Sequence, residues 1–269
     1  MCPRLFTIGP FSLPTYGLLV ALGFLLGLQI AGRLAKRSGL DPNHVTNLGV
    51  GIAIAAIIGA KVFMIFSRAD YYFSDLSRLF SFNTLQAGGV FYGGLLAAVG
   101  TAYYYVNKHG LPWLPTADVL APAAAAGHAV GRLGCFAAGC CWGRPSDAPW
   151  AVAFSDPAAH DFTGVPLGIH LHPTQLYESL GTALVALWLY RRFHKSHAPG
   201  VIFGWYLVLY SAFRFCVEFF RDYNARPMVF GNDALSATQY VAIGLIVGGV
   251  FLLWRARSQP AEELASSAG

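Results

Sequence analysis

The stretch ADVLAPAAAAGHAVGRLGCFAAGCCWGR, residues 117–144, joins a mostly apolar run to a segment rich in glycine and cysteine that begins at Gly131. An apolar run of about 20 residues is long enough for a helix to cross the hydrocarbon core of a membrane. Arg132 falls near the expected outer end of this span, where burying a guanidinium is costly. The stretch therefore predicts a membrane helix that ends in a functional segment.

The composition of the whole chain is typical of a membrane protein. Of its 269 residues, 55% are hydrophobic and only 12% are charged, and the mean hydropathy is +0.50. A soluble globular protein carries roughly twice that share of charged residues. Seven mostly apolar runs occur, near residues 14–35, 47–66, 87–107, 117–138, 173–190, 201–219 and 237–254. They predict an all-α polytopic membrane protein with about seven transmembrane helices.

The distribution of Lys and Arg predicts the orientation of the chain. One set of loops is strongly basic, whereas the opposite set, which holds the long loops 67–86, 139–172 and 220–236, is nearly balanced in charge. Cytoplasmic loops are typically the basic ones, so we expect the N-terminus outside and the C-terminus in the cytoplasm. The net charge of +5 reflects this asymmetry and does not indicate nucleic-acid binding.

The organisation along the chain is simple. No cleavage site with small residues precedes the first run, which we therefore expect to be retained. No linker or internal repeat is visible, so the sequence predicts one membrane-embedded domain over residues 1–269, with a short polar tail from about Ser258.

Ionisable side chains fall inside or at the ends of the predicted spans. They are Lys61, Asp118, Arg132, His172, Glu178, Arg214 and Glu218. Each needs a partner or a wet cavity at that depth. Arg132 and Arg214 lie near headgroup depth, where the planar guanidinium suits paired bonds to phosphate oxygens. The alternative is an ion pair of Arg132 with Glu178 or Glu218 that ties helices together.

A second polar segment, HPTQLYES at residues 172–179, stands where another predicted span begins. Pro173 fixes the turn after His172, and Thr174 or Ser179 could bond locally. Polar residues at this density seldom serve packing at the entrance of a span, so we expect this segment to line a site.

The chain contains five cysteines, which is an odd number. They are Cys2, Cys135, Cys140, Cys141 and Cys216. Adjacent cysteines form a poor disulfide, so we predict no disulfide framework. The three cysteines of segment 131–144 lack the two-residue spacing at which thiolates converge on zinc, and only His128 could complete the ligands. We therefore expect no metal and no organic cofactor, with thiols that pack as small apolar groups. The alternative is a thiol beside Arg132 that ionises and acts as a nucleophile.

Five segments occur in the order and at the spacing of a known family. They are IGPFSLPTYGL (8–18), GGVFYGGL (88–95), GRLGCFAAGCCWGR (131–144), HPTQLYES (172–179) and FRFCVEFFRD (213–222). Together they resemble the prolipoprotein diacylglyceryl transferases of bacteria over nearly the whole chain. The third and fourth segments are specific, whereas the glycine pairs of the second are a weak signal in a membrane protein.

The resemblance implies an enzyme of the bacterial inner membrane with its site toward the outer leaflet. It would transfer the diacylglyceryl group of phosphatidylglycerol to the thiol of the lipobox cysteine in a prolipoprotein signal peptide. The products would be a thioether and glycerol phosphate. Both substrates are embedded in membrane lipid, so they would enter sideways.

The resemblance also implies residue roles. Arg132 and Arg214 would clamp the phosphate and stabilise the leaving group, while Glu218 and Arg221 would position their helix. The incoming thiol must lose a proton, for which His172 is a candidate base. The other positions expected at the substrate site are Tyr16, Lys61, Cys135, Cys140, Gly143, Gln175, Tyr177 and Glu178.

The chain departs from the family pattern near the expected reacting centre. Tyr92 stands where the best-known members carry histidine, and Lys61 where arginine is common. Cys135, Ala138 and Cys140 replace two asparagines and a glutamate. A tyrosine hydroxyl with a pKa of about 10 is a poor base, so either His172 replaces it or the chemistry differs. A membrane enzyme that uses another acceptor, or a transporter or receptor with seven spans, is the alternative function.

Overall fold

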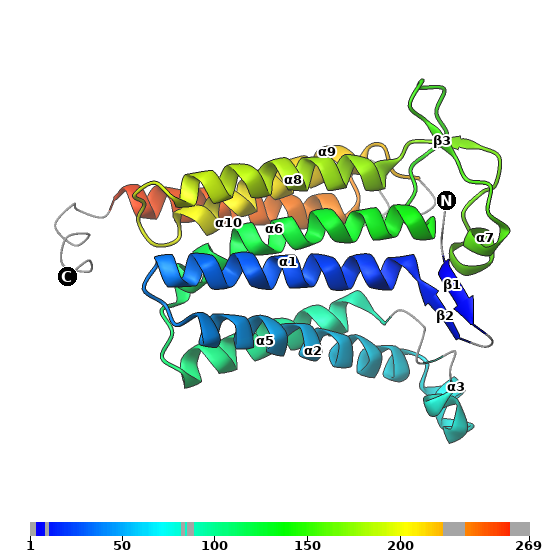
Figure 1. The fold of residues 1–269 in the computed structure, drawn as a ribbon, viewed down its shortest axis with the longest axis horizontal. Helices are drawn as coiled ribbons and strands as arrows, with labels where there is room; N and C mark the ends of the chain where they lie inside the picture. The colour runs from blue at the N-terminus through cyan, green and yellow to red at the C-terminus, as the bar shows by residue number, and fades with distance from the viewer. Residues whose placement is uncertain (1–3, 9–10, 82–83, 85–88, 223–234, 259–269) are drawn as a thin grey trace. The chain divides into compact units, whose positions relative to one another are not determined.

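A computed structural model describes residues 4–8, 11–81, 84, 89–222 and 235–258 (Figure 1). Cys2, Gly88, residues 223–234 and the tail after Ser258 lie outside this part of the chain. A helix forms at each of the apolar runs. These helices are α1 (Thr15–Arg37), α2 (Pro42–Ser67), α5 (Phe91–Lys108), α6 (Trp113–Ala138), α8 (Thr174–Phe193), α9 (Val201–Glu218) and α10 (Ala237–Arg257).

Of the helices in the described residues, α1, α2, α6, α9 and α10 are long and apolar enough to cross a membrane. This finding confirms a mainly helical membrane protein. Helices α5 and α8 are of similar length but carry more polar side chains, such as Gln175 and Glu178 in the first turns of α8. The number of seven spans and the orientation of the termini stay predictions.

Within the described residues, four short strands and three short helices lie outside the long helices of the predicted all-α fold. Strands β1 (Arg4–Ile8) and β2 (Phe11–Pro14) form an antiparallel hairpin, and β3 (Val152–Ala153) pairs with β4 (His170–Leu171). Short helices are α3 (Ala69–Phe73), η1 (Leu76–Phe80) and α7 (Pro157–Thr163). The segment between α6 and α8, which contains β3, α7 and β4, has a small core around the fully buried Phe154.

The chain divides into two compact units, one made of residues Met1–Ala31 and Ala117–Gly269 and the other of Gly32–Thr116. In the second unit, α2 and α5 pack backbone against backbone. A Cβ atom added to Gly93 would lie 2.5 Å from the carbonyl oxygen of Gly59, and one on Gly94 would lie 2.9 Å from that of Ala56. The paired glycines therefore serve close helix packing. The prediction of a single domain over residues 1–269 stays a prediction.

In the first unit, α1, α6, α8, α9 and α10 run alongside one another (Figure 1). Glycines again allow close approach, since a Cβ atom on Gly23 of α1 would lie 2.6 Å from the carbonyl oxygen of Gly127 in α6. Asp118 of α6 is buried and caps α9: its Oδ2 and Oδ1 accept hydrogen bonds from the backbone N–H groups of Gly200 (2.6 Å) and Phe203 (2.7 Å). This carboxylate thus has a structural partner in the positive end of a helix.

Candidate active site

Three arginines and two glutamates from α6, α8 and the C-terminal end of α9 meet in the first unit. Glu178 lies at their centre: its Oε2 is 2.6 Å from Arg132 Nη2, and its Oε1 is 3.9 Å from Arg221 Nη1 and 4.0 Å from Arg214 Nε. Glu218 Oε2 pairs with Arg214 Nη1 at 2.6 Å and with Arg221 Nε at 4.0 Å. We refer to these five residues as the arginine–glutamate cluster. It brings together five residues predicted to form the site.

Hydrogen bonds between helices hold the two carboxylates in place. Ser179 Oγ of α8 donates to the carbonyl oxygen of Ala129 in α6 at 2.8 Å, which fixes α8 beside Arg132. Glu218 Oε1 accepts from Ser236 Oγ at 2.9 Å. Ser236 is the N-cap of α10 and forms a capping box with Gln239. The cluster is therefore built into the packing of α6, α8, α9 and α10.

The acidic and basic side chains of the cluster differ in how deeply they are buried. The side chains of Glu178 and Glu218 are only 2% exposed, whereas those of Arg132, Arg214 and Arg221 are 14–16% exposed. Three guanidiniums against two carboxylates leave a net positive charge of one. The alternative considered for Arg132, an ion pair with Glu178 or Glu218, is present with Glu178, yet the glutamates do not neutralise the cluster. An anion that reaches the arginines could complete it.

His128 lies next to the arginine–glutamate cluster. From the sequence it was considered only as a possible zinc ligand. Its Nε2 accepts a hydrogen bond from Arg132 Nε at 3.0 Å and lies 3.9 Å from Glu178 Oε2. The imidazole also lies beside the ring of Tyr210 in α9, with the ring centroids 5.4 Å apart. The four-residue spacing of His128 and Arg132 places both on one face of α6, which is a signal the sequence did contain. Ser236 was missed because its partner Glu218 is distant in the sequence.

The segment HPTQLYES holds the glycine- and cysteine-rich turn that follows α6. Thr174 Oγ1 donates to the carbonyl oxygen of Cys141 and Gln175 Nε2 to that of Cys140, both at 2.7 Å. Thr174 and Gln175 are fully buried. The expectation that Thr174 or Ser179 bonds locally is wrong, because both hydroxyls reach carbonyl groups of the α6 segment instead. These polar residues thus join two segments that are distant in sequence.

The cysteines of this turn converge. Helix α6 ends in a Schellman motif, with hydrogen bonds from the Gly139 N–H to the Phe136 carbonyl (3.2 Å) and from the Cys140 N–H to the Cys135 carbonyl (3.1 Å), and with Gly139 at φ 76°. The Sγ atoms of Cys135, Cys140 and Cys141 all lie within 4.8 Å of one another as free thiols. The expectation that their spacing keeps the thiols apart is wrong, because the motif folds the chain back over the last turn.

Gly143 lies where three chain segments meet. Its N–H donates to the carbonyl oxygen of His172 at 3.0 Å, and the next residue, Arg144, donates to that of Phe220 at 2.9 Å. A Cβ atom at position 143 would lie 2.5 Å from the Phe220 oxygen and 2.7 Å from the His172 oxygen. Only glycine fits this junction, so Gly143 positions the segments around the cluster.

His172 has a different environment from the one expected. Its Nδ1 lies 3.0 Å from the Tyr177 hydroxyl, and its ring packs against that of Phe220. In the described residues His172 forms no hydrogen bond with Arg132 or Arg214. Trp150 Nε1 also donates to the Tyr177 hydroxyl, at 2.7 Å. Partial burial, and then the charge of Arg144, lower the pKa of His172 from its ordinary value. The imidazole therefore stays neutral to a more acidic pH than usual.

Three other residues predicted for the site are Tyr16 in the first unit, whose hydroxyl is close enough to Arg132 and Cys135 to interact electrostatically with them, and Lys61 and Tyr92. Tyr16 is half exposed on α1, and a Cβ atom on Gly134 of α6 would lie 3.2 Å from its backbone oxygen. Lys61 and Tyr92 belong to the second unit. Lys61 Nζ donates to the carbonyl oxygen of Thr84 at 2.6 Å, and Tyr92 is 60% exposed near the start of α5.

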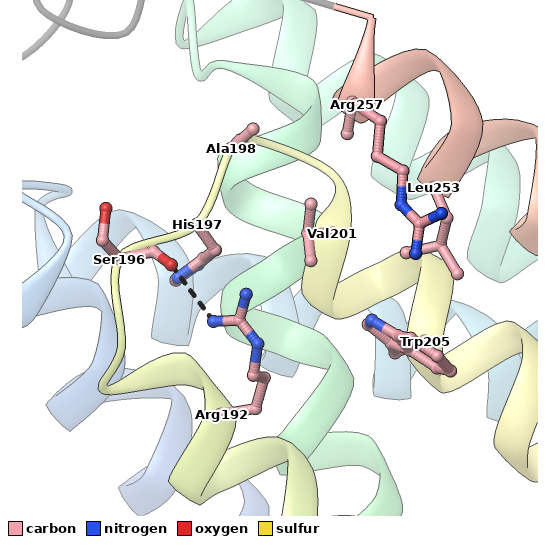
Figure 2. Close-up of a pocket in the computed structure, with 9 residues that line it drawn as sticks. Arg192, Ser196, His197, Ala198, Val201, Trp205, Leu253 and Arg257 are labelled. Atoms are coloured by element: carbon pink, nitrogen blue, oxygen red, sulfur yellow. Dashed lines mark hydrogen bonds between the residues drawn. The ribbon is translucent and has the colours of Figure 1, made fainter. Parts of the chain in front are cut away.

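A separate pocket of about 480 Å³ lies among the C-terminal ends of α8 and α10 and the start of α9 (Figure 2). Its lining includes Arg192, His197, Trp205 and Arg257. Arg192 Nη1 donates to the carbonyl oxygen of Ser196 at 3.1 Å, the bond drawn in Figure 2. Among the described residues its lining includes none of those predicted to form the site and no carboxylate, so the pocket is the weaker candidate.

The fold and the arginine–glutamate cluster define a helical membrane protein with a buried cationic site. Residues 3–255 match the family model of the prolipoprotein diacylglyceryl transferases. The chain is 35% identical to the phosphatidylglycerol–prolipoprotein diacylglyceryl transferase of Ruegeria pomeroyi over 97% of both chains. It is 34% identical to that of Finegoldia magna, over 94% of this chain and 95% of the relative. This chain belongs to the prolipoprotein diacylglyceryl transferase family, a family of transferases, and the predicted resemblance is confirmed.

Proposed function

We propose that this chain transfers the diacylglyceryl group of phosphatidylglycerol to the cysteine thiol of a prolipoprotein. The thiol sulfur forms a bond to the phosphate-bearing carbon of the diacylated glycerol, and the bond from this carbon to the phosphate oxygen breaks. Glycerol phosphate then leaves while the thiol proton passes to a base. The names of the relatives support both substrates. The observation that carries the proposal is the net positive arginine–glutamate cluster, because the departing phosphate gains negative charge.

Arg132 and Arg214 are the proposed phosphate ligands. In Arg132, Nη2 is engaged by Glu178 and Nε by His128, which orients the guanidinium. Within the described part of the chain, Nη1 has a long contact to Cys135 Sγ at 4.0 Å. Arg214 is held in the same way by Glu218. Arginines fixed before the substrate binds need little reorganisation when charge develops on the phosphate. Glu178, Glu218 and Arg221 are thus positioning residues.

His172 is the proposed proton acceptor for the incoming thiol. Its lowered pKa keeps the imidazole neutral, and a neutral imidazole is needed to accept a proton. A tautomer in which Nδ1–H donates to the Tyr177 hydroxyl would leave Nε2 as the base. The competing candidate is Tyr92, which occupies the histidine position of the family pattern. Comparing His172→Gln with Tyr92→Phe separates the two.

The other predicted residues are proposed to shape the substrate site. Gln175 and Gly143 act through the backbone of the turn, and Tyr177 acts through His172. Contacts with the lipid or the peptide are proposed for Tyr16, Lys61, Cys135 and Cys140. We further propose seven spans, an inner-membrane location with the N-terminus outside, a site toward the outer leaflet, and a lipobox cysteine as acceptor, supported by the basic loops expected on the cytoplasmic side.

The test uses purified full-length protein, phosphatidylglycerol vesicles and a lipobox peptide, with product measured by mass spectrometry. The expected result is a thioether-linked diacylglyceryl peptide together with an equal amount of glycerol phosphate. A peptide with serine in place of the lipobox cysteine is the matched control and should give no product. Turnover only with an amine or hydroxyl acceptor would contradict the proposed acceptor, and no turnover with any acceptor would contradict the reaction.

A further inference from the structure

The proposed contacts of Cys135 and Cys140 with the lipid or the peptide do not explain why three thiols, those of Cys135, Cys140 and Cys141 (the cysteine trio), lie so close together. The three residues lie at the end of α6 and in the turn that follows, and each is half buried. Their three sulfur atoms lie within 4.8 Å of one another. Three thiols that merely pack as apolar groups have no need to gather this closely, although the Cys140 thiol also donates to the carbonyl oxygen of Cys135 at 3.7 Å. We propose that the cysteine trio binds one Cu(I) ion through three thiolate sulfurs.

The spacing of the sulfur atoms fits three-coordinate binding. With metal–sulfur bonds of about 2.3 Å, three sulfurs around one ion in a plane are about 4 Å apart. The observed limit of 4.8 Å is within about 1 Å of this spacing.

The donor set selects the kind of metal. Thiolate is a soft ligand that favours Cu(I) and zinc. Structural zinc takes four ligands in a tetrahedron, but among the described residues no further histidine, cysteine or carboxylate joins this group. Cu(I) can be satisfied by three sulfurs. A three-sulfur site in this part of the chain thus fits a soft monovalent ion better than zinc.

The backbone that carries the cysteine trio is held in shape. The Schellman motif brings Cys140 over Cys135. Cys141 has a left-handed backbone conformation, with φ at 60°, which residues other than glycine rarely adopt. The buried side chains of Thr174 and Gln175 hold the carbonyl groups of Cys141 and Cys140. The Schellman motif and these hydrogen bonds from α8 both fix the backbone of the turn before any ion binds.

A nearby cation favours the charge that binding would create. Three thiolates and one Cu(I) ion carry two negative charges in total. Arg132 Nη1 lies 4.0 Å from Cys135 Sγ and can offset part of that charge. Binding replaces three S–H bonds with three Cu–S bonds and releases three protons to the solvent. Copper remains in the +1 state, so no oxidant or reductant is consumed.

The test uses full-length protein in which Cys2 and Cys216 are changed to serine, so that only the cysteine trio remains. Cys216 is exposed on α9, and Cys2 lies outside the described residues. The protein is titrated under anaerobic conditions with Cu(I) buffered by a chromophoric chelator. We expect one Cu(I) per chain, and X-ray absorption with three sulfur neighbours at about 2.3 Å. Cys135→Ser, Cys140→Ser and Cys141→Ser should each weaken binding at least tenfold.

Three results would overturn this assignment. The first is a protein that retains no more Cu(I) than the variant with all three cysteines changed to serine. The second is a spectrum with only two sulfur neighbours, which would leave one cysteine outside the site. The third is tighter binding of zinc than of Cu(I) in the same titration. Because the titration of the cysteine-trio protein does not depend on any serine variant of the trio, it remains decisive if those variants fold poorly.

Discussion

Two regions of the first unit each carry at least two arginines, and they differ in what fixes the side chains. In the arginine–glutamate cluster, Arg132 and Arg214 each lie 2.6 Å from a buried carboxylate. In the pocket of Figure 2, Arg192 bonds a backbone carbonyl and Arg257 is exposed. The number of cations alone therefore does not distinguish the two regions. What distinguishes the cluster is that its guanidiniums are held in place while a net positive charge remains.

Arg132→Ala and Arg214→Ala test this comparison with the largest expected effect. Each variant should lower the rate of thioether formation about a hundredfold or more, the size of effect seen when one preorganised donor is removed. Arg192→Ala, the matched control from the pocket, should change the rate less than twofold. Insertion and thermal melting in detergent are measured for all three. A pocket variant that loses as much activity as the cluster variants would remove the distinction.

Glu178→Gln tests whether the carboxylate is what holds the arginines. Removing one partner from a buried ion pair costs about 3–5 kcal/mol of stability, because the remaining charges lose compensation. Three arginines lie within 4.0 Å of this carboxylate, so turnover should fall together with the melting temperature. The conservative variant Glu178→Asp should recover part of both. Unchanged melting and turnover in Glu178→Gln would show that the cluster does not need this charge.

Gly143→Ala addresses the junction beside the cluster. The added methyl group would lie 2.5 Å from a backbone oxygen of Phe220, and overpacking of this kind costs about 1–3 kcal/mol. Both stability and turnover should decrease. Gly131→Ala is the matched control within the same motif, since a Cβ atom there has open space and alanine favours a helix. Equal stability of the two variants would contradict the role of close approach at Gly143.

The smallest expected effect is the contribution of His172 to the pH dependence of stability. Its folded pKa lies below the ordinary value of 6.5, so at pH values between the two the unfolded chain binds more protons than the folded one. Stability should therefore decrease slightly as the pH falls through this window. The decrease should be absent in His172→Gln. If His172 is the base, this variant also loses turnover while Tyr92→Phe retains it; the reverse pattern would assign proton removal to Tyr92.

The sequence predicted the helices more reliably than the contacts within the site. Apolar runs fix where helices form, because burial in lipid leaves the backbone few alternatives. The five charged residues that the sequence groups together also lie together in the structure, while their role in a site stays a prediction: Arg132, Arg214, Glu178, Glu218 and Arg221. The convergence of the three cysteines was not predicted from the sequence, because it depends on the Schellman motif that Gly139 allows. Asp118 needed a partner, but its role as the cap of α9 depends on a contact between residues 82 positions apart.

The sequence by itself determined a membrane-embedded helical chain, its family and the charged residues that enter its spans. Composition and motif order are enough for that, since they depend on local chemistry. Only the tertiary structure decided which charges pair, that Glu178 lies among three arginines, and that the cysteine trio converges. These contacts join α6, α8 and α9 at distances of a few ångströms. Local patterns cannot specify such pairings, because each depends on how distant segments pack.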